Sequence, residues 1–338
     1  MNIANQMDRK EKIMNWGIVS ASRISNKYVE ALKEEGCQIY AVAARDIERA
    51  NNFKRKHNIK IAYGSYEELF NDKNVDIVYI SNLNHEHYET VIKAIEAKKH
   101  VICEKPLSIS HQQAVNMAKA ATINNVFLME AMWTRCLPIY KEIHNLINSG
   151  EIGEIMQVRA DFSFMAEKKD GARFLNKDMG GGALYDIGIY SIMFILDFLG
   201  TDLKNVTASG FIGKSGVDEE SIVTINYGNG KMASMYNSFI SNRPRLGEII
   251  GTEGMITISD FNSAVSAKVS WFKKSESSVL QSERKDNMFV YEVREVVKSI
   301  TEGKTQSERI PLEHSIVSAY IIEKAIKEIC IQNGKNLN

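Results

Sequence analysis

The fold of the first half is indicated by the stretch Trp16-Gly17-Ile18-Val19-Ser20-Ala21-Ser22-Arg23-Ile24-Ser25. Its first four residues have the apolar character of a short buried strand, and the small residues after them predict a tight turn. A helix is then expected at residues 23–33. A strand, a small-residue turn and a helix in this order begin a βαβ unit on a parallel sheet.

The same alternation continues along the first half of the chain. Further strands are predicted at residues 38–43, 75–80, 100–103 and 126–129. Helices are predicted at residues 47–56, from 65, at 88–98 and at 110–122. Short strands that alternate with longer helices predict a doubly wound parallel sheet of the Rossmann type, which binds ligands beyond the carboxyl ends of its strands.

The pattern changes near Pro138. A helix is expected at 139–149, a strand at 155–164, and an apolar helix at 183–199 after the glycines 180–182. Residues 206–279 alternate short runs with turn signals, which predicts an open, mostly antiparallel sheet, and helices are expected at 289–300 and 313–330. We therefore expect an α/β protein with a polar tail at residues 1–13, a dinucleotide-binding Rossmann domain at 14–136 and a substrate-binding and dimerisation domain at 137–338.

Composition narrows the class of protein. A length of 338 residues suggests two domains at roughly 150 residues per domain. Because 42 Lys and Arg balance 42 Asp and Glu, no net field attracts nucleic acid or an anionic membrane. The four cysteines form no CxxC pair, and the N-terminus lacks an apolar signal segment. The longest apolar stretch, 187–199, is too short to span a bilayer, so we expect a cytoplasmic protein without nucleic-acid or membrane partners.

Small or polar residues follow two of the predicted strands. Ser20 and Ser22 lie in the first turn, where a dinucleotide needs small residues because its pyrophosphate approaches the backbone at a helix N-terminus. An ordinary small-residue turn is the alternative. The strand near residue 80 leads into His85 and His87, which have no metal-ligand spacing around them, so we expect them to cap and pack the next helix and predict no metal site.

A charged pair, Glu104-Lys105, follows the strand predicted at residues 100–103 and precedes a proline. Lys105 is expected to point into the crevice, where burial and a cofactor can shift its proton affinity. A surface ion pair at a strand end is the alternative. The next strand ends in a similar way, and places Trp133 and Arg135 near the same crevice.

Two polar residues interrupt the apolar helix at 183–199. Asp186 and Tyr190 are four residues apart and therefore share one helix face. Tyr190 could donate and accept a proton, with Asp186 as its orienting or electrostatic partner, and the preceding glycines allow close approach. A structural hydrogen bond between the two side chains is the alternative.

Taken in order along the chain, these motifs resemble the Gfo/Idh/MocA oxidoreductases. The resemblance rests on the first turn, Asn84-x-x-His87, Glu104-Lys105-Pro106 and Asp186-x-Gly-x-Tyr190, and it covers about residues 14–330. Residues 130–135 and 180–190 look most like the dimeric dihydrodiol dehydrogenase branch. The departures are Ser20 and Ser22 in place of the usual glycines, and Leu83 in place of the usual proline.

The resemblance implies reversible hydride transfer between a nicotinamide cofactor and the hydroxyl or carbonyl carbon of a sugar, polyol or related molecule. Tyr190 would exchange the hydroxyl proton, Lys105 would hydrogen-bond the same oxygen, and Asp186 would support them. The candidate substrate-pocket residues are Trp133, Arg135 and Arg173. The candidate cofactor-binding residues are Ser20, Ser22, Arg23, Ile24, Arg45, Ser81, Asn82, Asn84, His87, Glu104 and Lys105. A sensor of the same fold that binds a dinucleotide without turnover is the alternative.

The end of the second strand predicts NADP(H) rather than NAD(H). An NAD-specific site usually has a carboxylate there, which binds the ribose 2′-hydroxyl, but this chain has Ala44. Arg45 follows and could pair with a 2′-phosphate, while Asp46 is expected to cap the next helix and point away. Stacking of Arg45 on the adenine is the alternative.

Self-association is expected through the second domain. Its helices should cover one face of the sheet and leave the other free. Because side chains alternate along a strand, Met235, Asn237 and Phe239 are expected on one face of the sheet. Ser234, Tyr236 and Ser238 are expected on the other face. Because large exposed apolar patches usually mark interfaces, we expect a homodimer or a dimer of dimers formed sheet to sheet, which the resemblance also implies.

Overall fold

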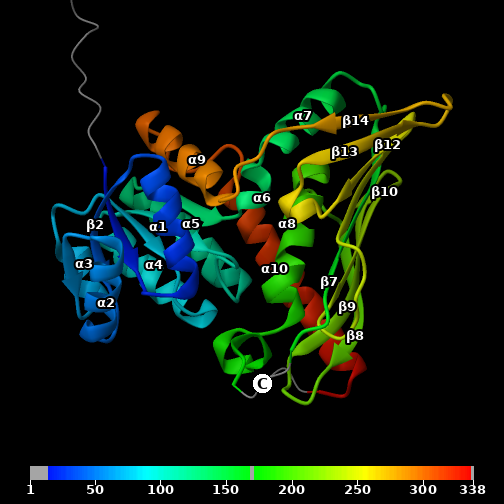
Figure 1. The fold of residues 1–338 in the computed structure, drawn as a ribbon. Helices are drawn as coiled ribbons and strands as arrows, with labels where there is room; N and C mark the ends of the chain where they lie inside the picture. Colours follow the sequence, from blue (N-terminus) through cyan, green and yellow to red (C-terminus); the bar gives the residue numbers. More distant parts are fainter. Residues whose placement is uncertain (1–13, 168–170, 336–338) are drawn as a thin grey trace, which may run out of the picture.

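The computed structural model describes residues 14–167 and 171–335, so the expected tail at 1–13 lies outside it. The N-terminal half, coloured blue to teal in Figure 1, is built on a six-stranded parallel sheet in the order β3-β2-β1-β4-β5-β6. Its strands are β1 (Asn15–Val19), β2 (Gln38–Ala43), β3 (Ile61–Tyr63), β4 (Ile77–Ile80), β5 (His100–Glu104) and β6 (Leu128–Ala131). Its helices are α1 (Arg23–Glu34), α2 (Ile47–His57), α3 (Tyr66–Asn71), η1 (Asn84–Glu86), α4 (His87–Glu96) and α5 (His111–Asn124).

Burial explains why the sequences of these strands consist mostly of apolar residues. All four residues of β4 are buried, because a parallel sheet with helices on both faces leaves no side of a central strand in water. The helices start where polar side chains can cap them. Ser22 accepts from the Ser25 amide at the start of α1, and Asp46 accepts from the Glu48 amide at the start of α2.

The C-terminal half is built on an eight-stranded sheet in the order β14-β13-β12-β11-β7-β10-β9-β8. Its strands are β7 (Ile155–Ser163), β8 (Asn205–Ile212), β9 (Asp218–Gly228), β10 (Lys231–Ser238), β11 (Leu246–Gly251), β12 (Gly254–Ser259), β13 (Ser266–Trp271) and β14 (Ser277–Gln281). Strands β7 and β10 pair in parallel, and the other neighbours pair antiparallel. These two sheets confirm the predicted fold class.

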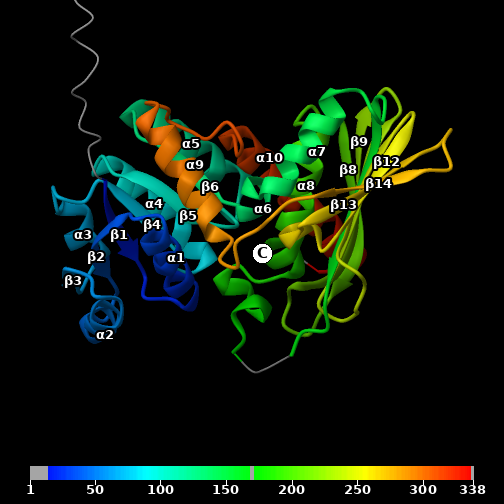
Figure 2. The ribbon, with the colours of Figure 1, turned by 45° about the horizontal axis from the view of Figure 1, so that its top comes forward.

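The connecting helices lie on the face of this sheet that is turned toward the N-terminal half (Figures 1 and 2). They are α6 (Trp133–Cys136), α7 (Pro138–Asn148), η2 (Arg173–Leu175), η3 (Lys177–Met179), η4 (Leu184–Gly188), α8 (Ile189–Leu199), η5 (Phe261–Ser263) and α10 (Leu312–Gln332), whereas α9 (Phe289–Thr301) lies against α1 of the N-terminal half. Met235 and Asn237 of β10 are buried on the covered face, while Ser234 and Tyr236 on the other face are half-buried, as the alternation predicted.

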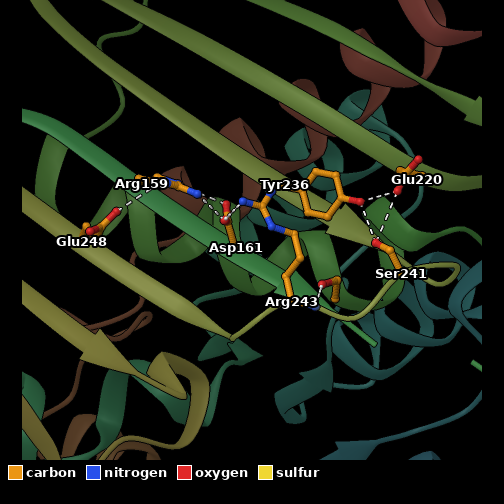
Figure 3. Close-up of polar contacts among 8 residues, drawn as sticks. Arg159, Asp161, Glu220, Tyr236, Ser241, Arg243 and Glu248 are labelled. Atoms are coloured by element: carbon orange, nitrogen blue, oxygen red, sulfur yellow. Dashed lines mark hydrogen bonds and ion pairs between the residues drawn. The ribbon is translucent and has the colours of Figure 1, made fainter. Parts of the chain in front are cut away.

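The uncovered face is more polar than we expected. Its centre holds a charged network in which Asp161 binds Arg159 at 2.7 Å and Arg243 at 3.4 Å, and Tyr236 donates to Glu220 (Figure 3). The strands of this sheet also carry exposed apolar side chains, which are Phe211, Ile222, Met232 and Val279. Charged side chains, Arg159 and Asp161, occupy outward positions of the central strand β7, which the sequence analysis did not predict.

The last two helices return to the N-terminal half. Helix α9 packs on α1, and its Arg294 forms two hydrogen bonds with Glu35 at 2.7 and 2.8 Å. Helix α10 packs on α5 of the N-terminal half and on β8 of the C-terminal sheet, so it contacts both halves of the protein. Just before α10, the Thr305 carbonyl accepts from the amide of Leu128 in edge strand β6. Residues far along the chain thus cover one edge of the first sheet.

Most element boundaries fall close to their predicted positions, with two differences that matter. Strand β3 has only three residues and was not predicted. In place of the single helix expected from Ala183, the chain forms a π-turn, η4, followed by the α-helix α8. The first backbone hydrogen bonds of this segment therefore join residues further apart in sequence than those of an α-helix. By length and composition residues 177–199 could cross a membrane, but 72% of the apolar 18-residue window within that segment is buried inside this fold.

Candidate active site

A cavity of about 710 Å³ lies where the carboxyl ends of the parallel strands face the C-terminal half. The turns after β1, β2, β4 and β5 contribute to its wall, as expected for a ligand site of a doubly wound sheet. Segments of α6, η2 and α8 complete it. Its lining residues are Ser20, Ser22, Arg23, Ile24, Lys27, Arg45, Arg49, Ser81, Asn82, Leu83, Asn84, Glu86, Glu104, Lys105, Trp133, Arg173 and Tyr190.

Lys105 links the two halves at one end of this cavity. It directly follows β5, after a buried Glu104, and its peptide bond to Pro106 is cis. The Lys105 Nζ donates to the main-chain carbonyl of Asp186 at 2.5 Å and lies 3.5 Å from the Asp186 Oδ1. The ammonium group is therefore fixed by both the backbone and the side chain of one residue.

Asp186 is an ionised group in a nearly enclosed place. Burial alone would raise its pKa, but Lys105 and Arg173 outweigh that effect and hold the pKa below its usual value. The Arg173 guanidinium donates to the Asp186 Oδ1 at 2.9 Å. Lys105 and Arg173 thus share one carboxylate, and Lys105 lines the cavity beside it.

Tyr190 stands beside Lys105 in the first turn of α8. Its side chain is 5% exposed, and the Lys105 Nζ lies 4.9 Å from the centre of its ring. Trp133 and Phe162 hold that ring from other sides, with centroids 5.4 and 5.6 Å away. Burial, followed by the field of Glu104 and Asp186, raises the pKa of Tyr190 well above its usual value, so the phenol carries its proton.

Glu104, the buried residue before Lys105, stabilises the Lys105–Tyr190 end of the cavity. It accepts a hydrogen bond from the Tyr79 hydroxyl at 2.6 Å, and burial raises the pKa of its carboxyl despite that bond. A second buried acid, Glu130, accepts from the Leu107 amide at 2.9 Å and fixes the backbone just after Lys105-Pro106. These contacts give the segment around Lys105 little freedom to move.

The opposite end of the cavity is formed by the first turn. Ser20 has a positive φ of 79°, a conformation that usually selects glycine. Ser22 caps α1, and its hydroxyl lies 3.0 Å from that of Ser81 at the end of β4. The first turn therefore has serines at the positions where glycines are usual, and the Ser22 side chain joins the turn to the end of β4 by a hydrogen bond.

Exposed cations surround this end. Arg45 and Arg23 line the cavity as predicted, and so do Lys27 and Arg49, which the sequence reasoning missed. Each missed residue lies four positions after a predicted cation, which is the spacing of one helix face and the signal that could have found it. Arg45 pairs with Glu86, Ala44 is buried, and Asp46 caps α2.

The polar residues after β4 have distinct places. Asn82 and Asn84 line the cavity, and the Asn84 amide donates to the Gly180 carbonyl at 2.9 Å. His87 is buried outside the cavity lining, with its ring nitrogens 2.8 Å from the Pro106 carbonyl and 3.3 Å from the Asn82 carbonyl. Burial lowers its pKa to about 4, so it supports the site as a neutral imidazole.

Two predicted substrate-pocket residues, Trp133 and Arg173, line the cavity, but Arg135 does not. The Arg135 guanidinium is buried, 2.5 Å from Asp197 and 2.7 Å from the His314 ring. Its placement in the pocket was therefore wrong, because a buried guanidinium takes an available carboxylate. Among residues 14–167 and 171–335, no three His, Cys, Asp or Glu side chains are grouped as metal ligands.

The cavity fits a dinucleotide phosphate. Helix α1 points its N-terminus at the first turn, where backbone amides and the helix dipole favour an anion. Four cationic side chains stand around that end, namely Arg23, Lys27, Arg45 and Arg49. The cationic phosphate end and the enclosed Lys105–Tyr190 end together suit an elongated, anionic cofactor with a reactive group at one end.

Two family descriptions match the chain. "Oxidoreductase family, NAD-binding Rossmann fold" matches residues 14–132, and "GFO/IDH/MocA C-terminal domain" matches residues 140–257. Among curated relatives, trans-1,2-dihydrobenzene-1,2-diol dehydrogenase of Xenopus tropicalis is 35% identical over 324 residues, which are 93% of this chain and 97% of the relative. The mouse protein of that name, from Mus musculus, is 34% identical over 326 residues, or 94% and 97%.

Solved structures share the fold. A 3-ketoreductase from Actinomadura kijaniata, crystallised with NADP and TDP-benzene, has a TM-score of 0.83 at 24% identity, covering 94% of this chain and 98% of that one. An NAD-binding oxidoreductase from Klebsiella pneumoniae has a TM-score of 0.85 at 23% identity, covering 94% and 97%. The whole described fold, and not one half of it, therefore has structural counterparts.

Proposed function

Since the chain belongs to the Gfo/Idh/MocA family of NAD(P)-binding oxidoreductases, we propose that it oxidises a CH–OH carbon of a vicinal diol, or reduces the corresponding carbonyl, with Lys105 and Tyr190 at the reacting oxygen. The observation that carries this proposal is the Lys105 ammonium, fixed 2.5 Å from the Asp186 carbonyl and beside the Tyr190 ring in the cavity. A trans-1,2-diol, a sugar and a polyol all present such a carbon.

Each residue has a separate task. In reduction, Tyr190 gives the proton that its raised pKa keeps on the phenol to the substrate oxygen; in oxidation, the tyrosinate left after that proton has been lost takes one from the substrate hydroxyl. The Lys105 ammonium donates to the same oxygen and stabilises the negative charge that develops on it. Asp186, which Arg173 binds in turn, holds that ammonium in place. The nicotinamide, when bound, supplies or accepts the hydride.

For the cofactor, we propose NADP(H) over NAD(H). The buried Ala44 stands where a carboxylate would repel a 2′-phosphate, and Arg45 and Arg49 line that end of the cavity. Arg45 already pairs with Glu86, so binding a phosphate would exchange one anionic partner for a more highly charged one. Asp46 is occupied in capping α2 and does not compete for the ribose.

The test is turnover against a panel of trans-1,2-diols, sugars and polyols with both cofactors, in wild type and Tyr190→Phe. Removing a general acid–base group typically costs about 10²–10⁴ in rate. We expect that loss with cofactor affinity nearly unchanged. Cofactor binding without turnover of any substrate would instead assign the protein as a sensor, and equal turnover of the two proteins would refute the role of Tyr190.

We also propose a homodimer formed through the uncovered sheet face. The face carries both signs of charge, with Arg159 and Arg243 beside Asp161 and Glu248, so two copies can place unlike charges opposite each other (Figure 3). The exposed apolar side chains of this sheet would be buried in the same contact. Light scattering of the wild type should give a dimer mass at micromolar concentration, and a monomer mass would refute the proposal.

A further inference from the structure

We propose that Asp218 is a positioning residue for the reaction, which fixes the start of the helical segment that carries Asp186 and Tyr190 and so sets where the Lys105 ammonium is held. This inference rests on the roles proposed above for Lys105 and Tyr190. Asp218 is the first residue of β9, so the anchor comes from the large sheet and not from the segment it holds.

The contact is a helix cap made by a distant side chain. Asp218 is 2% exposed, and its Oδ2 accepts the Leu184 amide at 2.8 Å. The Ala183 amide also hydrogen-bonds to its carboxyl. The first amides of a helix have no partner within it, and a carboxylate at that end also interacts favourably with the helix dipole. One side chain thus holds the first two amides of the segment.

Gly182 makes this approach possible. Its φ is 127°, and a Cβ at this position would lie 2.2 Å from the Asp218 Oδ1. No side chain fits there unless the carboxylate moves. The last glycine of the sequence Gly180-Gly181-Gly182 therefore has a specific task, which is to admit the carboxylate of Asp218.

The anchored amides are close in sequence to the reacting groups. Asp186 follows Leu184 by two residues, and its amide donates to the Gly182 carbonyl at 3.0 Å. Its own carbonyl receives the Lys105 Nζ at 2.5 Å. A shift at the start of the segment would therefore move the acceptor of Lys105 directly. A misplacement of about 1 Å can cost about 100-fold in rate.

The anchor also responds to protons. Burial raises the pKa of Asp218 to about 7, against the hydrogen bonds from Leu184 and Ala183. The titratable or charged groups around it are Glu219, the next residue on β9, and Tyr185, Lys177, Cys330 and Lys335, which line the same cavity of about 320 Å³ as Asp218. That cavity provides a route for proton exchange. The ionised carboxylate is the stronger acceptor, so the cap should weaken as pH falls through about 7.

The first experiment needs no variant and no substrate. Hydrogen exchange of wild-type peptides covering residues 183–190 should, after correction for the intrinsic rate, become faster relative to α10 as pH falls from 8 to 6. An unchanged ratio would overturn the proposal. Because this measurement does not depend on turnover, the anchor can be confirmed even if the proposed reaction is refuted by the substrate panel.

The second experiment compares Asp218→Asn and Gly182→Ala with Asp202→Asn, an exposed acid paired only to Lys204 among its described ion pairs. Both test variants should lose about 10- to 100-fold in kcat, keep the cofactor dissociation constant within about twofold, and accelerate exchange at residues 183–190. As the cap weakens, wild-type kcat should fall when the pH drops through about 7, and Asp218→Asn should remove this fall. If the two test variants kept the kcat of wild type, the positioning role would be refuted. If they lost cofactor binding and exchange protection throughout the chain to an equal extent, Asp218 would have a general structural role instead.

Discussion

At the end of the cavity near Lys105, ionised side chains are enclosed and paired, whereas at the end near Arg45 they stand in water. The Lys105 and Asp186 side chains are 14% and 18% exposed, while that of Arg45 is 65% exposed. Charges held in a low-dielectric place interact strongly, but only in one geometry. Exposed charges act over a longer distance, are screened by salt and tolerate rearrangement.

This difference matches the task that we propose for each end. The enclosed end must hold a proton donor and an ammonium within a short distance of one oxygen atom. The exposed end must attract an anionic cofactor and release it after each cycle. Substitutions near Lys105 should therefore lower the rate, and substitutions near Arg45 should lower cofactor affinity. Failure of the following predictions would contradict this division.

The largest effect is expected for Lys105→Met. Loss of the ammonium removes the hydrogen bond to the substrate oxygen, while Asp186 keeps Arg173 as its partner. We expect kcat to fall about 10²–10³-fold, the loss seen when one oxyanion donor is removed, with cofactor affinity within about twofold. Steady-state kinetics and a fluorescence titration of cofactor measure the two quantities. Lys93→Met, on an exposed ion pair with Glu67, is the control, and comparable loss of affinity and rate would contradict the division.

The next effect concerns the acid stability of the enclosed end. The folded-state pKa of His87, lowered to about 4, lies below its usual 6.5, so the neutral ring stabilises the fold above pH 6.5 and this stability is lost as pH falls toward 4. The loss attributable to His87 between pH 7 and pH 5 is about 2 kcal/mol. Urea unfolding at both pH values should show a smaller difference in His87→Gln than in wild type. An equal difference would mean that His87 is not neutral in the fold.

At the exposed end, Arg45→Ala should raise the KM for NADP about 10-fold and leave NAD kinetics almost unchanged. A lost charge-assisted contact is worth roughly 1.5–3 kcal/mol, and the exposure of Arg45 places it at the lower limit. Because exposed charges are screened, the difference between wild type and variant should shrink in high salt. Equal weakening for the two cofactors would indicate stacking on the adenine instead of binding of the 2′-phosphate.

The smallest effect is expected for Asp46→Ala. This residue caps α2 through the Glu48 amide, so its loss should cost about 1 kcal/mol of stability and leave the preference between cofactors unchanged. Ser65→Ala removes a similar cap from α3 and is the matched control, measured by the same urea unfolding. A changed cofactor preference in Asp46→Ala alone would show that Asp46 faces the ribose.

The sequence predicted the cavity wall formed by the parallel sheet better than the wall formed by the C-terminal half. Strand periodicity placed the turns after β1, β2, β4 and β5, and the topology of a parallel sheet brings those turns together. The position of Arg135 was missed because its partners Asp197 and His314 lie 62 and 179 residues away, where no local pattern can indicate them.

Two further misses have local causes that composition does not reveal. A π-turn and an α-helix bury almost the same residues, so the apolar run after Ala183 did not distinguish them. The charges on the open sheet face were missed because alternation reports which residues point outward, not whether their neighbours on β7 and β11 are charged. The role of Gly182 likewise depends on Asp218, a contact that only the folded chain shows.

The return of α9 and α10 to the N-terminal half has a consequence for synthesis on the ribosome. Tyr28 and Leu32 of α1 are fully buried in the finished protein, and α9 packs on that helix. When the first six strands leave the exit tunnel, residues 289–332 have not yet been translated. The nascent first half therefore exposes apolar surface and an unpaired β6 edge until the last helices emerge. Completion of the cofactor-binding half should be post-translational, and a chain truncated before α9 should need a chaperone to stay soluble.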